Sequence, residues 1–595
     1  MQADTRPPES GSQTPAVSYP SRLRETLGVL LASIYPEQDK DALTRAVLEA
    51  FLGVGVRPRR RGRTPTNTLW SERDSYLICY GNSLQDGQHK PLDLLLDFLQ
   101  QRLRGTISGV HILPYFPYTS DDGFAVTDYL AVDSGLGSWE DINRIAAHFR
   151  LMSDLVLNHC SSQGNWFNAY LQGHSPWDRY FREASPGDDL SQVVRPRTHP
   201  LLREVETAMG KRHVWCTFSH DQVDLDFANP EVLCEFLRIM RYHIERGVRT
   251  FRLDAVAFLW KEVGTPCINL RQTHEIIRLM RTLCDFNEEP VILVTETNLP
   301  NVENLSYFGN RNEAHMAYNF SLPPLILHGL LNGTSKYLNA WQMGMPPAQL
   351  GCAYLNFTAS HDGIGLRPAE GLIPDDEIDK VIAAAVRFGG KVSMRETATR
   401  GVRPYEINIA LFDALAGTVD GRDRWQMERF LCSQTIAMAL EGIPAFYIHS
   451  LLATPNDLET VVRTGHNRAI NRRRWDYAEL VQLLDRGDTM QGLVFNEMKR
   501  RIDIRIVQPA FHPNATQFTL QLGEQLFGFW RQSMDRAQSI FAIHNLCGDT
   551  VEVPPTSLNL IDGDDWSDLL SGESIREFSE NTQFTPYQCR WITNR

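Results

Sequence analysis

Eight short apolar runs, each separated from the next by a longer segment with helical patterning, set the strongest limit on how this chain can fold. They lie at residues 75–80, 109–115, 155–159, 250–255, 291–296, 316–321, 353–360 and 445–449. Near-continuous apolar strands joined by helical crossovers are typical of a parallel sheet that is buried on both faces. Eight such units are the number that closes a (β/α)8 barrel, so we predict an α/β fold of that type.

The spacing between these runs is uneven at two places. The third and fourth runs, and the seventh and eighth, are separated by far more residues than one helix needs. We therefore expect an inserted subdomain at 160–225 and an active-site loop insertion at 363–425. Both would lie on the rim at the C-terminal ends of the strands, where barrel enzymes hold their active sites. The barrel itself would comprise residues 67–159 and 226–486.

The two ends of the chain differ from the barrel in pattern. Residues 1–20 are rich in Pro, Ser and Gly and predict a disordered leader without a secretory signal. Residues 21–66 begin with two apolar stripes at helical spacing, which predict an N-terminal helical extension, and end in an arginine-rich run interpreted as a solvated loop. Residues 487–595 contain alternating runs that predict a C-terminal antiparallel β domain.

Charge and composition exclude several classes of protein. The formal net charge of -13 argues against binding to a nucleic-acid backbone or an anionic membrane surface. No apolar stretch approaches the roughly 18 uncharged residues that a membrane-spanning helix requires. The ten cysteines form no C-x-x-C pair, so we expect neither a disulfide framework nor a metal site. We expect a cytoplasmic protein with no nucleic-acid or membrane partner, and the sequence indicates no oligomeric state.

Polar residues stand at the C-terminal ends of four predicted strands. Because these ends meet at one mouth of a barrel, their side chains should lie close together. The residues are His159 on the third strand, Arg252 and Asp254 on the fourth, Glu296 on the fifth, and His361 and Asp362 after the seventh. Asp154 stands at the start of the third predicted strand, and we interpret it as structural.

The residue types at this mouth fit retaining glycosidic chemistry. Arg252 and Asp254 share one face of their strand, and a guanidinium beside a carboxylate should lower its pKa and keep it ionised as a nucleophile. A buried ion pair is the alternative. Glu296 follows an apolar strand, which should raise its pKa and suit it to act as acid and base. Asp362, with His361 and His159, would then hold sugar hydroxyls and stabilise a positively charged transition state.

The segments DLVLNH, FRLDAV, VTET and SHD, in this order on these strands, resemble the four short motifs of the α-amylase family, glycoside hydrolase family 13. The resemblance implies three catalytic roles: Asp254 as nucleophile, Glu296 as acid and base, and Asp362 as stabiliser of the transition state. It also implies a glucose subsite that includes Arg252, His159 and His361.

Longer segments between residues 70 and 480, among them GVHILPYFPYTSDDGFAVTDY and GHNRAINRRRWD, resemble the sucrose-phosphorylase subfamily. In that subfamily inorganic phosphate, in place of water, attacks the glycosyl-enzyme and gives α-glucose 1-phosphate. The partners implied are therefore a small sugar substrate and phosphate, with no cofactor and no metal. The glucose subsite implied also includes Asp121, Phe124, Gln222 and Arg468, and Arg197 with Tyr405 would contact phosphate or acceptor.

Arg197 fits that role on its own chemistry. It follows a rigid proline in the segment Arg195-Pro196-Arg197, within the subdomain predicted to overhang the mouth. A guanidinium fork suits the oxygens of phosphate. The alternative for Arg197 is a salt bridge between domains.

The sequence constrains the identity of the acceptor less than that of the glucose subsite. Thr297-Asn298 and the loop from Arg400 to Pro404 depart from sucrose phosphorylases, whereas the TETN, SDDGF and PYEIN segments resemble glucosylglycerate and glucosylglycerol phosphorylases. Arg400 and Arg403 would pair with a glycerate carboxylate, or serve phosphate or only the loop, so glycerol and glycerate both stay open. Sucrose or sucrose 6'-phosphate phosphorolysis is the alternative activity. A glucosidase or transglucosylase ranks lower, as does a non-catalytic barrel, which has no need of all three carboxylates.

Overall fold

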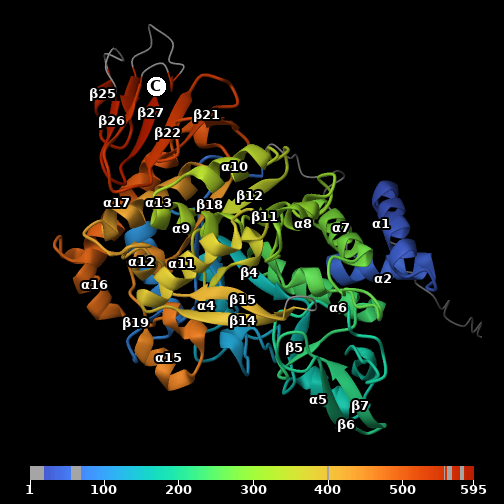
Figure 1. Ribbon diagram of the computed structural model, residues 1–595. Helices are drawn as coiled ribbons and strands as arrows, with labels where there is room; N and C mark the ends of the chain where they lie inside the picture. Colours follow the sequence, from blue (N-terminus) through green and yellow to red (C-terminus); the bar gives the residue numbers. More distant parts are fainter. Residues whose placement is uncertain (1–18, 55–68, 398–400, 555–556, 559–565, 576–581) are drawn as a thin grey trace, which may run out of the picture.

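A computed structural model describes residues 19–54, 69–397, 401–554, 557–558, 566–575 and 582–595, and its centre is a closed parallel barrel (Figure 1). The barrel strands are β1 (Tyr76–Cys79), β3 (Gly109–Ile112), β4 (Arg150–Val156), β9 (Val248–Asp254), β10 (Ile292–Thr295), β11 (Met316–Tyr318), β12 (Ala353–Asn356) and β18 (Ile443–Tyr447). They follow one another in this order around the barrel, and β18 pairs with β1 to close it. Each predicted run overlaps one of these strands, so the predicted fold class is confirmed.

The third strand, β4, begins at Arg150 and not at residue 155 as expected. Ser153 and Asp154 interrupt the apolar pattern, yet both are fully buried. In the register of β4 and β9, Asp154 lies opposite Arg252, which gives its carboxylate a partner inside the barrel. A polar residue with such a partner is compatible with a buried strand, and this is why the apolar run alone marked the start too late.

Helices cover the outside of the barrel. Those between barrel strands include α3 (Pro91–Phe98), α4 (Trp139–Ala146), α6 (Pro230–Ile244), α7 (Arg271–Asp285), α9 (Leu322–Asn332), α10 (Lys336–Gly344) and α13 (Gln426–Ala439). Their boundaries follow local chemistry. Ser138 and Asp141 form a capping box at the start of α4, and Asn229 caps α6, whose first residue is Pro230.

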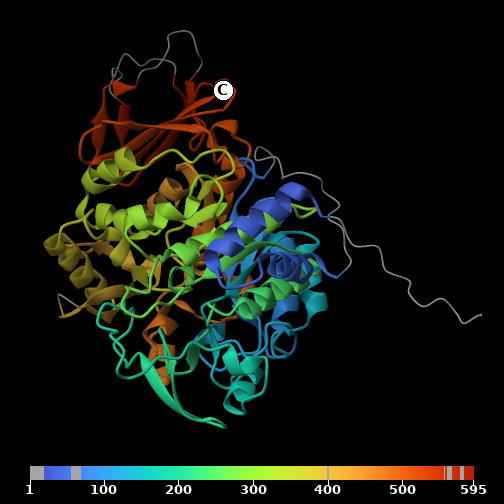
Figure 2. The same cartoon turned by 90° about the vertical axis from the view of Figure 1, so that its right-hand side faces the viewer.

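The N-terminal extension forms two helices, α1 (Ser21–Ile34) and α2 (Lys40–Leu52), which pack on α7 and α6 (Figure 2). Ser33 donates a 2.8 Å hydrogen bond to Glu275 on α7, and the Tyr35 hydroxyl donates to the carbonyl of Phe227. The extension is therefore attached to the outer face of the barrel. Most of the predicted leader and the arginine-rich run 57–63 lie outside the described residues.

The segment between β4 and β9 carries β5 (His159–Ser161), α5 (Asn165–Leu171), β6 (Leu202–Thr207), β7 (Gly210–Trp215) and β8 (Gln222–Asp224). β6 and β7 form a hairpin, and β5 pairs with β8. The pairing of β5 and β8 brings Gln222 opposite Ser161, two residues from His159. Side chains from this segment thereby reach the mouth of the barrel.

The segment after β12 forms a second structure at the same rim. It contains β13 (Ile364–Gly365), α11 (Asp375–Arg387), β14 (Lys391–Thr397) and β15 (Gly401–Asn408). The three strands form a sheet in the order β13-β15-β14, which lies beside α11 in Figure 1. This sheet carries Tyr405 and Glu406 towards the barrel mouth.

The C-terminal part of the chain ends in an antiparallel sheet, as predicted, but this sheet begins later than residue 487. Its strands are β20 (Thr516–Leu520), β21 (Leu526–Gln532), β22 (Ser539–Asn545), β27 (Cys589–Thr593), β24 (Trp566–Asp568) and β25 (Ser574–Ile575). Residues 490–505 form instead the helix α17 (Met490–Arg505), which packs on α13. Its buried side chains Phe495, Met498 and Ile502 have helical and not alternating spacing. In the described part of the chain, no helix is long and apolar enough to cross a bilayer.

Candidate active site

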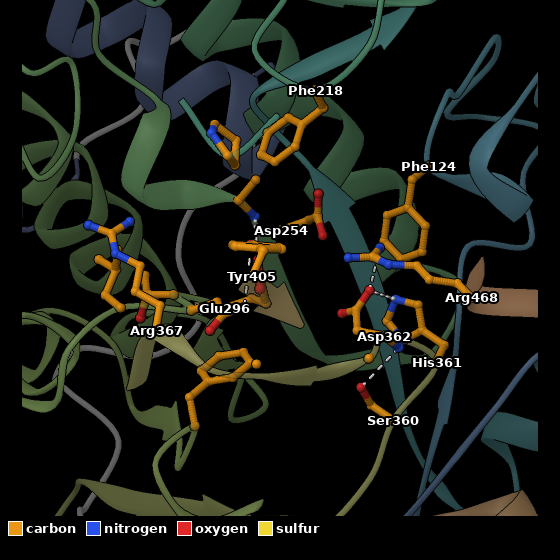
Figure 3. A pocket seen from close by; sticks show the side chains of 18 of the residues that line it. Phe124, Phe218, Asp254, Glu296, Ser360, His361, Asp362, Arg367, Tyr405 and Arg468 are labelled. Atoms are coloured by element: carbon orange, nitrogen blue, oxygen red, sulfur yellow. Dashed lines mark hydrogen bonds and ion pairs between the residues drawn. The ribbon is translucent and has the colours of Figure 1, made fainter. Parts of the chain in front are cut away.

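One pocket at the C-terminal ends of the barrel strands gathers all but one of the residues that the sequence predicted for the site (Figure 3). Those that line it are Asp121, Phe124, His159, Arg197, Gln222, Arg252, Asp254, Glu296, His361, Asp362, Tyr405 and Arg468. The exception is Arg403. Its half-exposed side chain lies 3.7 Å from Asp375 and lines a different hollow, so the structure does not bring Arg403 to this pocket. Arg400 lies outside the described residues.

Arg252 lies close to three carboxyl groups, on β4, on β9 and directly after β10. Its Nη1 donates to Asp254 at 2.7 Å and to Asp154 at 2.6 Å, and its Nη2 lies 3.9 Å from Oε1 of Glu296. The second oxygen of Asp154 lies 2.7 Å from Nε2 of His111. Asp154 therefore holds the guanidinium in place, and the positive charge lies next to Asp254 and Glu296.

A left-handed turn follows Asp254 directly. Ala255 has φ of +49°, a conformation that is unfavourable for a residue with a side chain and that recurs at functional sites. Its N–H donates a 2.9 Å hydrogen bond to Oε2 of Glu296. The strained residue thus connects the end of β9 to the carboxyl group at the end of β10.

Burial raises the pKa of both Asp254 and Glu296. Arg252 opposes this rise, while Glu296 adds to it at Asp254 and Asp362 adds to it at Glu296. The rise at Glu296 was predicted, but the fall expected at Asp254 is wrong, because desolvation outweighs the guanidinium. Two buried carboxyls with raised pKa values favour a state with one shared proton. The shorter contact with Arg252 favours the negative charge on Asp254 and the proton on Glu296.

Asp362 differs from the other two carboxyl groups. Burial would raise its pKa, but Arg468, His361 and Arg252 together hold the pKa well below its usual range. Nη1 of Arg468 lies 2.6 Å from Asp362, while its other edge makes two hydrogen bonds to Glu406. Asp362 is therefore an ionised group fixed at one side of the pocket, beside Arg468 and His361 in Figure 3.

The predicted sugar subsite is a connected set of rings and hydrogen-bonding groups. The ring of His361 stacks on Phe124 at a centroid distance of 4.9 Å. Nε2 of His159 lies 3.1 Å from the carbonyl of Phe124 and 3.2 Å from the amide of Gln222. The same amide donates to Asp121 at 3.3 Å. These contacts give a flat apolar face edged by donors and acceptors, an arrangement suited to a hexose ring.

Arg197 lies between two aromatic rings. Its guanidinium carbon is 5.3 Å from the centroid of Tyr405 and 5.9 Å from that of Phe218. Among the described residues no carboxylate pairs with Arg197, so its charge is available to a ligand. The salt-bridge alternative has no partner in that part of the chain.

The roles of several residues that line or support the pocket were not found from the sequence. Asp154 and Glu406 position Arg252 and Arg468, and Arg367 with Arg395 brings two further guanidiniums to the lining. For Arg367 a sequence signal existed, since it follows Asp362 by five residues in the same rim segment. Nothing in the pattern of β14 distinguished Arg395 from the surface arginines.

Comparison with known proteins agrees with this geometry. Residues 82–341 match the catalytic domain of the α-amylases. The chain is 39% identical to the glucosylglycerate phosphorylase of Spirochaeta thermophila over 586 residues, which cover 96% of this chain and 98% of that protein. The chain belongs to the α-amylase family. The predicted resemblance to its phosphorylase members is confirmed.

Two further relatives extend the comparison within the α-amylase family. The glucosylglycerol phosphorylase of Marinobacter adhaerens is 30% identical over 427 residues, covering 68% of this chain and 82% of that one. The crystal structure of sucrose 6F-phosphate phosphorylase from Thermoanaerobacter thermosaccharolyticum matches with a TM-score of 0.70 at 23% identity, covering 88% of this chain and all of that one. The latter similarity supports the fold.

Proposed function

We propose that this enzyme reversibly converts 2-O-α-glucosylglycerate and phosphate to α-glucose 1-phosphate and glycerate, with retention of configuration. The observation that carries the proposal is that one pocket holds the three carboxyl groups together with Arg197, a guanidinium with no carboxylate partner among the described residues. The much greater identity and coverage of the glucosylglycerate phosphorylase than of the glucosylglycerol phosphorylase supports glycerate as the acceptor.

In the first step a carboxylate oxygen of Asp254 forms a bond to the anomeric carbon. The bond from that carbon to the glycerate oxygen breaks, and this oxygen takes the proton of Glu296. Asp362 is ionised and stabilises the positive charge that develops on the sugar ring. Arg252 keeps Asp254 aimed at the anomeric carbon.

In the second step a phosphate oxygen attacks the anomeric carbon from the face that glycerate left. The bond to Asp254 breaks, and Glu296 recovers a proton from the attacking phosphate. Arg197 would hold the phosphate, since a guanidinium pairs with two phosphate oxygens at once.

A charged sugar phosphate does not cross a bilayer unaided, so we propose that the reaction takes place in the cytoplasm, with no nucleic acid or membrane as partner.

The test is phosphate release from α-glucose 1-phosphate when purified enzyme meets D-glycerate, glycerol, fructose, fructose 6-phosphate or water alone. Release that depends on D-glycerate supports the proposal. Release with glycerol or a fructose acceptor in preference to glycerate would assign a different phosphorylase. An equal rate in water alone would make the protein a hydrolase and would remove the role given to Arg197.

A further inference from the structure

Two arginines of the pocket lining, Arg367 and Arg395, have no role in the proposed reaction. Arg367 follows β13, and Arg395 lies on β14. Both line the same pocket as Glu296. In Figure 3, Arg367 lies on one side, His361 and Asp362 lie on the other, and Glu296 and Tyr405 are between them. Since Glu296 protonates the glycosidic oxygen, the glucose would lie towards Asp362 and the acceptor towards Arg367.

The charges lining the pocket do not balance. It contains six arginines and four carboxyl groups. Arg252 and Arg468 are paired with carboxylates of the catalytic set, and Arg395 makes an ion pair with Glu370. The side chain of Arg367 has no hydrogen-bond or ion-pair partner among the described residues. Burial and the neighbouring Arg395 lower the pKa of Arg367, and Glu303, Tyr405 and Glu370 offset only part of this effect.

Within the described residues, the guanidinium of Arg395 also has an unpaired donor. Its contact with Glu370 leaves Nε buried without a hydrogen-bond partner in the described part of the chain. Two neighbouring guanidiniums inside a pocket repel each other, and a bound anion is the usual compensation for such an arrangement. The position therefore calls for a negatively charged ligand at the acceptor end.

We propose that Arg367, supported by Arg395, binds the carboxylate of the acceptor and so makes the enzyme select glycerate over glycerol. This inference rests on the proposed function. Arg367 takes the role that the sequence analysis gave to Arg403, whose side chain faces away from the pocket towards Asp375. Phosphate is assigned to Arg197, which stacks on the ring of Tyr405 and comes from the segment between β4 and β9. Two anions that arrive in successive steps would thus be held by different guanidiniums.

The test compares glycerate and glycerol as acceptors for Arg367→Gln, with the kcat/KM ratio of the two as readout. A hydrogen-bonded charge pair of this kind is worth at least about tenfold, so the ratio should fall by that factor or more. The reaction with glycerol and the KM for phosphate should stay within about threefold of wild type. Arg395→Gln should lower the ratio less, since Glu370 takes part of its charge. The matched control is Lys391→Gln, an exposed residue on β14 that lines no pocket described.

Three results would overturn the inference. One is an unchanged ratio in Arg367→Gln with an unchanged KM for phosphate, and another is an unchanged ratio with a raised KM for phosphate, which would make this a phosphate site. If Arg367→Gln does not fold, Arg367→Met takes its place, since it keeps much of the aliphatic stem and removes the charge. A ratio in that variant equal to wild type, with Arg395→Gln also unchanged, would count against binding of the acceptor carboxylate by Arg367. Failure of wild-type enzyme to use D-glycerate at all is a different outcome, which would refute the proposed function itself.

Discussion

Asp154 accepts a 2.6 Å hydrogen bond from Nη1 of Arg252 inside the barrel, where both side chains are almost completely shielded from solvent. Because His111 occupies the second oxygen of Asp154, this carboxylate is fixed on both sides. The guanidinium it holds is the same group that contacts Asp254 and Glu296. The geometry of the pair Asp254 and Glu296 therefore depends on a residue that does not line the pocket.

Replacing Asp154 should reduce catalysis without touching substrate. In Asp154→Asn the guanidinium loses its buried counter-charge and is no longer held in place, so kcat should fall at least about tenfold. The variant should also be less stable by about 3–5 kcal/mol, the usual effect of breaking a buried ion pair. Steady-state kinetics and urea unfolding test both effects, with the exposed Asp420→Asn as control. Unchanged kcat would show that Asp154 serves only packing.

Glu296 should set the alkaline side of the pH profile for cleavage of the glucoside. Its pKa is raised above the ordinary value of 4.5, so the carboxyl keeps its proton to higher pH, and activity should fall as pH rises through the raised value. The acid side should report the pair, since Asp254, the proposed nucleophile, is ionised once the two coupled carboxyls hold a single proton and its contact with Arg252 favours the charge there. Glu296→Gln should lose about 10²–10⁴-fold in kcat for natural glucosides and lose the alkaline limb. Retention of that limb in the variant would assign it to another group.

Arg197→Ala should weaken phosphate binding selectively. Loss of a charge-assisted contact should raise the KM for phosphate about tenfold or more and increase hydrolysis relative to phosphorolysis. The exposed Lys211→Ala, from the neighbouring hairpin, should leave both quantities unchanged. An equal loss of phosphorolysis and hydrolysis in Arg197→Ala would point to a general structural role.

Glu441 should make the protein less stable as pH rises through the weakly acidic range. Burial raises its pKa to about 7, with Arg531 and the Ala348 N–H opposing the rise. Between the unfolded value of 4.5 and 7 the folded state binds more protons than the unfolded state, so the free energy of unfolding should decrease with pH by about 3 kcal/mol from this group. Glu441→Gln should remove that dependence. The free energy of unfolding, measured with urea at pH 5 and 7.5, is the readout. An equal change in this free energy between the two pH values in both proteins would contradict the prediction.

The amino-acid sequence by itself determined the barrel, because each strand carries its own apolar run and each such run overlaps an observed strand. It also indicated Asp254, Glu296 and Asp362, since the C-terminal ends of parallel strands meet at one mouth wherever a barrel closes. Both features depend on the local sequence pattern of each strand and on the closure of eight parallel strands into a barrel. The helix α17 was missed, because the boundary of the C-terminal β domain was placed at residue 487, before this helix begins.

Only the tertiary structure decided the partners of these residues. Asp154 and Arg252 are 98 residues apart and meet through strand register. Arg367 and Arg395 reach the pocket, whereas Arg403, on the strand next to Arg395, faces outward. Local pattern contains no information about which guanidinium faces a cavity, since all three lie in polar rim segments. That choice depends on how β13, β14 and β15 fold against the barrel, and therefore on long-range packing.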